Sequence, residues 1–90
     1  MTIKLYGSQH WPSCPGVKEA LLQRNVAFEY IEITDSMKNL KEFLKIRDKS
    51  DDFKIVRRVH SVGIPMLLID GEVHLNITDD FLDELAKDHI

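Results

Sequence analysis

The sequence has little cysteine and no long apolar run, and these absences narrow the classes of protein that it can encode. Its single cysteine, Cys14, cannot form an internal disulfide, and a lone thiol is typical of the reducing cytoplasm. No apolar run approaches the roughly 20 residues that a membrane-spanning helix needs, and the N-terminus has no signal-peptide pattern. Because repeats, low-complexity segments and glycine-rich linkers are also missing, we expect residues 1–90 to form one cytoplasmic domain without membrane association.

Charge is low overall but unevenly distributed. The formal net charge of −3 does not favour nucleic acid as a partner. Residues 41–60 carry seven Lys or Arg against four Asp or Glu, whereas residues 70–90 carry seven acidic residues and one lysine. The basic segment fits a solvated, ion-paired helix, and it also fits a surface for a small acidic ligand or an acidic protein. The solvated helix is the simpler interpretation.

The hydrophobic pattern predicts an α/β domain with the order β-α-β-α-β-β-α. Strands are indicated at 2–6, 27–33, 65–70 and 72–75, with Glu29 and Glu32 on the solvent face of the second. Helices are indicated at 15–24, 37–46 and 53–59, and in a last segment that is capped by Thr78 or Asp79. A strand–helix–strand start requires a parallel first pair, and the closing hairpin adds two antiparallel strands. We therefore expect a mixed four-stranded sheet flanked by helices on both faces.

The most informative stretch is Trp11-Pro12-Ser13-Cys14, between the first strand and the first helix. In many small redox domains this junction reads Cys-x-x-Cys. The first thiol then lies just ahead of the helix, where helix N–H groups stabilise its thiolate and solvent reaches it. Trp11 holds that position here, and an indole cannot attack a disulfide. A catalytic cycle that forms and reduces a disulfide between two cysteines of this chain is therefore excluded.

The segment from Tyr6 to Lys18 resembles the active-site pattern of the glutaredoxins, small members of the thioredoxin fold. The family pattern is Y-x-x-x-x-C-P-x-C-x-x-A-K, which Tyr6, Pro12, Cys14 and Lys18 match and Trp11 does not. The resemblance covers nearly the whole chain and implies a thioredoxin fold of the glutaredoxin-like type.

Three further segments support this resemblance. Gly63-Ile64-Pro65-Met66 stands at the place of the family's T-V-P, which implies a cis peptide bond before Pro65. Ile69-Asp70-Gly71-Glu72 is similar to the family's final hairpin, and Ser36–Asp48 is similar to the longer second helix of a bacterial glutaredoxin-related subgroup.

The resemblance also implies a site for glutathione or for protein thiols and disulfides. Cys14 stands at the position of the resolving thiol and is the candidate catalytic residue. The candidate binding residues lie in the loop, before the cis-proline and at the start of the last helix: Trp11, Pro12, Ser13, Ile64, Pro65 and Thr78. Two usual glutathione anchors are absent, since Ser8 stands in place of a lysine and Leu75–Asp79 lacks a Gly-Gly turn. We predict no metal site.

Two other assignments stay open. A shifted register makes Cys14-Pro15-Gly16-Val17 the motif and Cys14 the nucleophile, but it lengthens the loop after Tyr6 and displaces Lys18. The same order of elements also forms the first domain of glutathione transferases, which the chain resembles without their second, helical domain.

Two functional hypotheses follow. The first is a glutaredoxin-like thiol–disulfide oxidoreductase with weak, single-cysteine chemistry through Cys14. The alternative is a redox-inactive binding module that holds an extended peptide in a groove between Trp11 and Pro65. A buried free cysteine behaves as a small apolar side chain, so the accessibility of Cys14 separates the two. In either case we expect a monomer with no resident cofactor and with glutathione as a candidate ligand.

Overall fold

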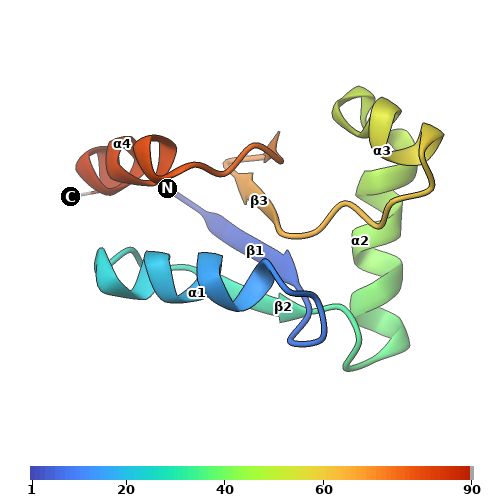
Figure 1. Cartoon of the computed structure of the whole chain (residues 1–90), viewed down its shortest axis with the longest axis horizontal. Coiled ribbons are helices and arrows are strands. Elements are labelled where there is room, and N and C mark those ends of the chain that lie inside the picture. Colours follow the sequence, from blue (N-terminus) through green and yellow to red (C-terminus); the bar gives the residue numbers. More distant parts are fainter. Residues whose placement is uncertain (90) are drawn as a thin grey trace.

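The computed structural model describes residues 1–89 as one α/β unit (Figure 1). The elements in chain order are β1 (Ile3–Gly7), α1 (Cys14–Gln23), β2 (Glu29–Glu32), α2 (Met37–Lys49), the 3-10 turn η1 (Asp51–Phe53), α3 (Lys54–Arg58), β3 (Met66–Ile69), β4 (Glu72–His74) and α4 (Asp79–His89). The strands and helices predicted from the hydrophobic pattern are all present, with small differences at their ends.

The four strands form one mixed sheet in the order β2-β1-β3-β4. β1 pairs with β2 in parallel and with β3 in antiparallel orientation, and β3 pairs with β4 in antiparallel orientation. The hairpin between β3 and β4 turns at Asp70 and Gly71, which both have positive φ, as a two-residue Asp-Gly turn requires. This topology confirms the predicted thioredoxin-like architecture.

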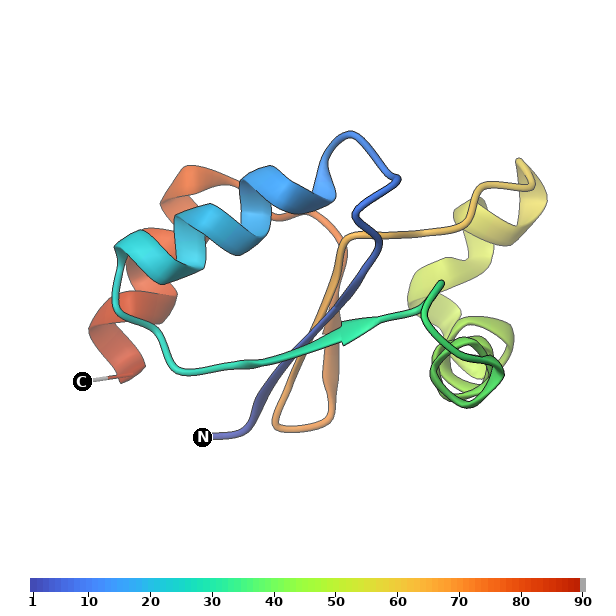
Figure 2. The ribbon, with the colours of Figure 1, turned by 90° about the horizontal axis from the view of Figure 1, so that it is seen from below.

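Two apolar clusters cover the two faces of the sheet because successive side chains of a strand point in opposite directions. Leu5 and Leu67 pack with α1 and α4, whereas Tyr6 and Met66 pack with α2 and η1. Figure 2 shows the same division, with α1 and α4 on one side of the strands and α2 and α3 on the other. The Tyr6 hydroxyl also donates a 2.6 Å hydrogen bond to Glu42 of α2.

Side-chain caps define where two helices start. Ser36 accepts a 3.1 Å hydrogen bond from the backbone N–H of Asn39 at the start of α2. Thr78 accepts an equivalent 3.1 Å bond from the N–H of Phe81 at the start of α4. Each cap satisfies a backbone donor that has no partner within the helix.

Gly7 permits a close approach between the end of β1 and the start of α1. A Cβ atom at this position would lie 3.1 Å from the Cys14 sulfur and 3.2 Å from the Cys14 Cβ. Because Cys14 is only 1% exposed, its side chain has little room to retreat. The glycine therefore sets how deeply Cys14 sits beneath the loop.

We expect Gly7→Ala to destabilise the fold by roughly 1–3 kcal/mol, the usual cost of overpacking a core. Gly16→Ala is the matched control, because a Cβ there meets nothing within 4 Å. In α1 this second change should stabilise the protein by up to about 1 kcal/mol through helix propensity. Chemical denaturation of both variants measures the effects, and equal effects of the two changes would contradict the packing argument.

Candidate functional site

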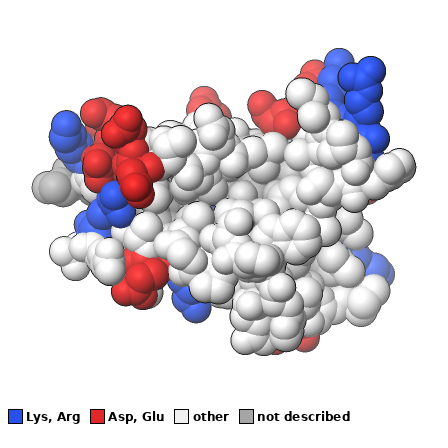
Figure 3. Space-filling model, viewed as in Figure 1, with Lys and Arg blue, Asp and Glu red and all other residues white. Residues whose placement is uncertain are grey.

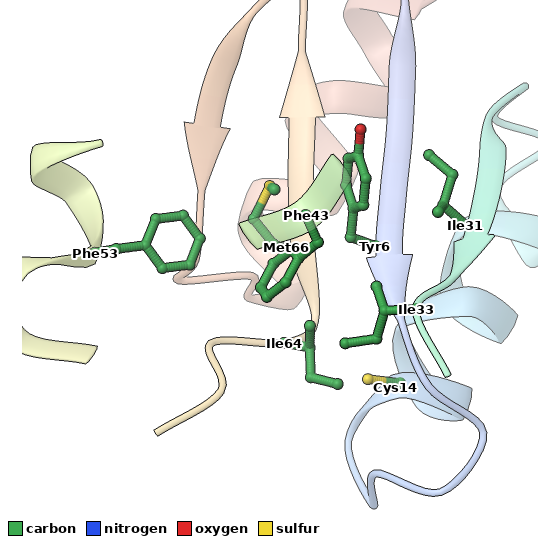
Figure 4. Close-up of a cluster of buried hydrophobic side chains, with 8 residues drawn as sticks. All are labelled: Tyr6, Cys14, Ile31, Ile33, Phe43, Phe53, Ile64 and Met66. Atoms are coloured by element: carbon green, nitrogen blue, oxygen red, sulfur yellow. The ribbon is translucent and has the colours of Figure 1, made fainter. Parts of the chain in front are cut away.

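The fold brings the β1–α1 loop next to the segment that leads into β3. Figures 1 and 2 both place residues 8–13 beside this segment. The peptide bond between Ile64 and Pro65 is cis. Ile64 and Cys14 belong to one buried cluster, and Figure 4 shows the Cys14 sulfur pointing toward Ile33 and Ile64. Two segments far apart in sequence therefore meet at the thiol.

Ser8 organises the loop. It is 2% exposed, and its carbonyl oxygen accepts a 3.1 Å bond from the N–H of Trp11. Its hydroxyl accepts a 3.1 Å bond from the N–H of His10 and lies 3.1 Å from the Thr34 hydroxyl. The N–H of Cys14 then bonds to the carbonyl of Trp11 at 3.1 Å. These turns hold the backbone tightly while the side chains between them face outward.

We use the name Trp11 face for the exposed loop residues Trp11, Pro12 and Ser13 together with the segment Val62–Pro65, of which Val62 is exposed and Gly63 and Pro65 are partly exposed. Trp11 and Val62 are each 37% exposed, and Pro12 and Ser13 are also exposed. Figure 3 shows no Lys, Arg, Asp or Glu side chain over the middle of the molecule, where this loop and segment lie. An uncharged surface of this kind suits a partner that offers backbone and apolar groups.

Ile64 contributes its backbone to the Trp11 face. Its side chain is buried, with 8% exposed. Within residues 1–89, neither its N–H nor its C=O forms a hydrogen bond. Polar backbone groups in folded proteins are normally paired. Ile64 therefore offers one donor and one acceptor to an extended chain.

Thr78 lies apart from this group. Its hydroxyl is the cap of α4, and its carbonyl accepts a 3.0 Å bond from the N–H of Leu82. No hydrogen bond within residues 1–89 links it to the β1–α1 loop. Of the predicted binding residues, Trp11, Pro12 and Ser13 thus lie in the loop that precedes Cys14, and Ile64, which precedes Pro65, shares a buried cluster with that thiol. Thr78 has the capping role that the sequence predicts.

Cys14 is the first residue of α1 and is 1% exposed. Burial raises the pKa of its thiol above the ordinary value. The backbone N–H of Ser8 opposes this shift by bonding to the sulfur, and the Glu32 carboxylate raises the pKa further. A helix N-terminus favours a thiolate, but here burial and the nearby carboxylate prevail. The neutral thiol is therefore the dominant form at neutral pH.

Glu32, at the end of β2, is tied to the loop rather than to solvent. Its carboxylate accepts hydrogen bonds from the N–H of Gln9 at 2.8 Å, from the Tyr30 hydroxyl at 2.9 Å and from the Thr34 hydroxyl. Alternation along the strand places Glu32 on the face opposite to the buried Ile31 and Ile33, as predicted, but its side chain is only partly exposed. The hydroxyl donors of Tyr30 and Thr34 lie two residues away in the sequence, whereas the Gln9 N–H comes from the β1–α1 loop, a contact that no local spacing signals.

The hydrogen bonds to Glu32 also determine its charge. Partial burial raises the pKa of the carboxyl, but the bonds from Thr34, Gln9, Tyr30 and Ser8 outweigh it and lower the pKa to about 2. Glu32 is therefore a fixed negative charge next to Cys14, and it ties β2 to the loop.

A cavity of about 420 Å³ opens on the β2 side of the loop. Its lining residues are Gln9, Pro15, Lys18, Tyr30, Glu32, Asp35 and Asn39. None of them belongs to the Trp11 face. The Lys18 ammonium lies 4.3 Å from the centre of the Tyr30 ring, so the cavity's cation already has an aromatic partner.

Two kinds of site are missing from residues 1–89. No group of three or more His, Cys, Asp or Glu side chains is placed to hold a metal ion. No helix in this range is long and apolar enough to cross a membrane.

We expect a maleimide probe to label Cys14 slowly in the native protein and rapidly after denaturation, because the buried sulfur must be uncovered before it reacts. The pH midpoint of native labelling should lie above that of the unfolded chain, in line with the raised pKa. Fast native labelling with a midpoint below that of the unfolded chain would show an exposed, stabilised thiolate instead.

Glu32 should make the fold sensitive to acid. Its pKa is about 2 in the folded protein against 4.5 for the free side chain, so between these values only the unfolded state binds the proton. Stability is therefore retained above pH 4.5 and lost as the pH falls toward 2. The slope should approach about 1.4 kcal/mol per pH unit. Urea denaturation at several pH values should show that Glu32→Gln removes most of this slope, whereas the exposed Glu29→Gln leaves it intact.

Comparisons with known proteins agree with this architecture. The glutaredoxin family model matches residues 3–74. An uncharacterized glutaredoxin-like 8.6 kDa protein in the rubredoxin operon of Clostridium pasteurianum is 26% identical over 85 residues, which cover 94% of this chain and 97% of that protein. An uncharacterized protein of Haemophilus influenzae is 37% identical over 54 residues, which cover 59% of this chain and 63% of that protein.

A solved structure shares the fold over almost the entire chain. The crystal structure of a mutant of the thioredoxin-like protein BC3987 superposes with a TM-score of 0.63 and 26% sequence identity, and it covers 96% of this chain and 95% of that one. The family match spans most of the sequence and includes β1, the β1–α1 loop, the cis-proline and the final hairpin. The chain belongs to the glutaredoxin family and has its thioredoxin-like fold.

Proposed function

We propose that this glutaredoxin-family protein is a binding module, which holds an extended peptide on the Trp11 face and does not use Cys14 as a nucleophile. The observation that carries this proposal is the burial of Cys14, which is 1% exposed and has a raised pKa. A thiol must be reachable and ionised to attack a disulfide. Neither condition is met at neutral pH, and Trp11 replaces the accessible family cysteine.

The free backbone groups of Ile64 support peptide binding. An extended segment that aligns with this residue can donate one hydrogen bond to its C=O and accept one from its N–H, as a strand added to a sheet does. This contact reads backbone and not side chains, so the buried Ile64 side chain does not interfere. Trp11 then supplies an aromatic surface for whatever side chain the ligand presents, since tryptophan is favoured at binding surfaces.

Glutathione is the smallest ligand with such a backbone. It can pair with Ile64, but Ser8 is buried beneath the loop, where the family carries a lysine, and provides no charge for a carboxylate. The Asp79 and Asp80 carboxylates in the first turn of α4 also oppose an anion at that end. A longer peptide gains contacts that do not depend on these anchors, so we expect peptides to bind more tightly than glutathione.

Single-cysteine chemistry is the second candidate, and the position of Cys14 as the first residue of α1 favours it. After local opening of the loop, the thiolate would attack a disulfide to form a mixed disulfide and release one thiolate. A glutathione thiolate would then attack that mixed disulfide, regenerate Cys14 and leave with the bound sulfur. Both steps keep the number of disulfide bonds constant, and neither needs a second cysteine in the chain.

We expect Trp11→Ala to weaken the binding of S-methylglutathione, which can pair its backbone but cannot exchange disulfides, by about tenfold, the loss typical of removing a central aromatic contact. Trp11→Phe keeps an aromatic ring and should retain most of the affinity. Cys14→Ser should bind like the unchanged protein. Isothermal titration calorimetry of these three variants measures the affinities, and an unaltered affinity of Trp11→Ala would mean that the face is not the site.

A glutathione-coupled disulfide reduction assay separates the two candidates. The binding module predicts little turnover in the unchanged protein and the same background in Cys14→Ser. Substantial turnover that disappears in Cys14→Ser would instead establish Cys14 as the catalytic residue.

A further inference from the structure

The short helix α3 and the turn after it expose apolar side chains. Ile55 is 72% exposed and Val59 is 63% exposed. They stand four residues apart, so they lie on one side of the helix and form a stripe. Val62 extends the apolar surface beyond the helix with 37% of its area exposed. Scattered exposed apolar residues are ordinary, but a contiguous stripe marks an interaction surface.

Two cations flank this stripe. Lys54 directly precedes Ile55, and Arg58 directly precedes Val59. Both cationic side chains are exposed. Within residues 1–89 neither side chain forms an ion pair or a hydrogen bond. Figure 3 shows blue side chains at the upper right, where Figure 1 places α3, with some red side chains beside them. The preceding turn η1 carries two exposed carboxylates, Asp51 and Asp52.

Two other arginines hold the surface rigid from within. Arg47 of α2 donates hydrogen bonds of 3.0 Å to the carbonyl of Val62 and 2.7 Å to that of Ser61. Arg57 donates bonds of 2.6 Å to the carbonyl of Arg47 and 2.8 Å to that of Ser50. The backbone is thus fixed on both sides of α3. A preorganised surface binds with less loss of conformational entropy.

The stripe leads directly into the Trp11 face. Val62 is part of both, and Ile64, with its free backbone groups, follows two residues later. A chain that pairs with Ile64 can therefore continue over Val62 onto α3. The two surfaces form one path along the protein.

We propose that Lys54, Ile55, Arg58, Val59 and Val62 form a docking surface for an acidic, apolar segment of a protein partner. This inference rests on the proposed function, because it names the kind of peptide that the Trp11 face would hold. Charge complementarity selects carboxylates for the unpaired cations, and the exposed stripe selects apolar side chains between them. A peptide also offers backbone groups that can pair with Ile64, which a lipid headgroup does not, so a protein segment is the better fit.

The test uses two fluorescein-labelled synthetic peptides of leucine and serine, one with glutamates and one with lysines at the same positions. We expect the protein to bind the glutamate peptide more tightly, with an affinity that falls as salt rises. Lys54→Glu/Arg58→Glu should weaken this binding by about tenfold and strengthen binding of the lysine peptide. Ile55→Ser/Val59→Ser should weaken binding of both peptides. All four side chains are exposed, so the variants should fold.

Lys38→Glu/Lys41→Glu on α2 is the matched control, since it makes the same charge change at two other exposed lysines. Equal effects of the α3 and α2 reversals would overturn the docking surface. Sedimentation with phosphatidylserine vesicles that depends on Lys54 and Arg58, without peptide binding, would also overturn it and assign the surface to a membrane.

If Trp11→Ala abolishes S-methylglutathione binding while the α3 variants change nothing, the proposed function stands and this inference fails. If the α3 variants weaken peptide binding while Trp11→Ala leaves S-methylglutathione binding unchanged, the docking surface stands and the proposed function fails.

Discussion

The close contact between Gly7 and Cys14 is the constraint on which the rest of the site depends. It joins the end of the central strand to the start of α1 and places the sulfur 3.1 Å from where a Cβ of residue 7 would lie. Once the sulfur is this deep, the loop must turn back over it, and Ser8 supplies the hydrogen bonds for those turns. Trp11 is then directed outward because the space beneath the loop is filled.

The same burial determines the chemistry of the thiol. The N-terminus of a helix usually stabilises an anion, and the family uses this effect for catalysis. Here the exposed position of that motif holds an indole, and the remaining sulfur lies in an apolar cluster with Ile33 and Ile64. The Glu32 carboxylate adds a fixed negative charge nearby. The helix N-terminus favours a lower pKa for the thiol, whereas burial and the Glu32 carboxylate raise this pKa. The raising effects prevail.

The proposed recognition of a peptide does not require an accessible thiol. The backbone groups of Ile64 remain unpaired, the Trp11 face is uncharged, and α3 continues the same path with apolar and basic side chains. The arginines that hold α3 are themselves satisfied by carbonyl groups, whereas Lys54 and Arg58, the other two cations of α3, have no ion pair or hydrogen bond within residues 1–89. The groups that we propose to bind a peptide are therefore different from the thiol that redox chemistry would use.

By itself, the sequence determined the order of the strands and helices, the mixed character of the sheet and the loss of the first active-site cysteine, since these depend on local periodicity, turn residues and a motif of fixed spacing. The strand order β2-β1-β3-β4 became visible only in the tertiary structure. The sequence also indicated Ile64 and Pro65 through resemblance. Only the tertiary structure decided that Cys14 is buried and that Glu32 turns toward the loop. The sequence also indicated Thr78 as a cap of the last helix, which the structure confirms. Burial and pKa depend on which distant segments pack around a side chain, and no local pattern encodes that packing.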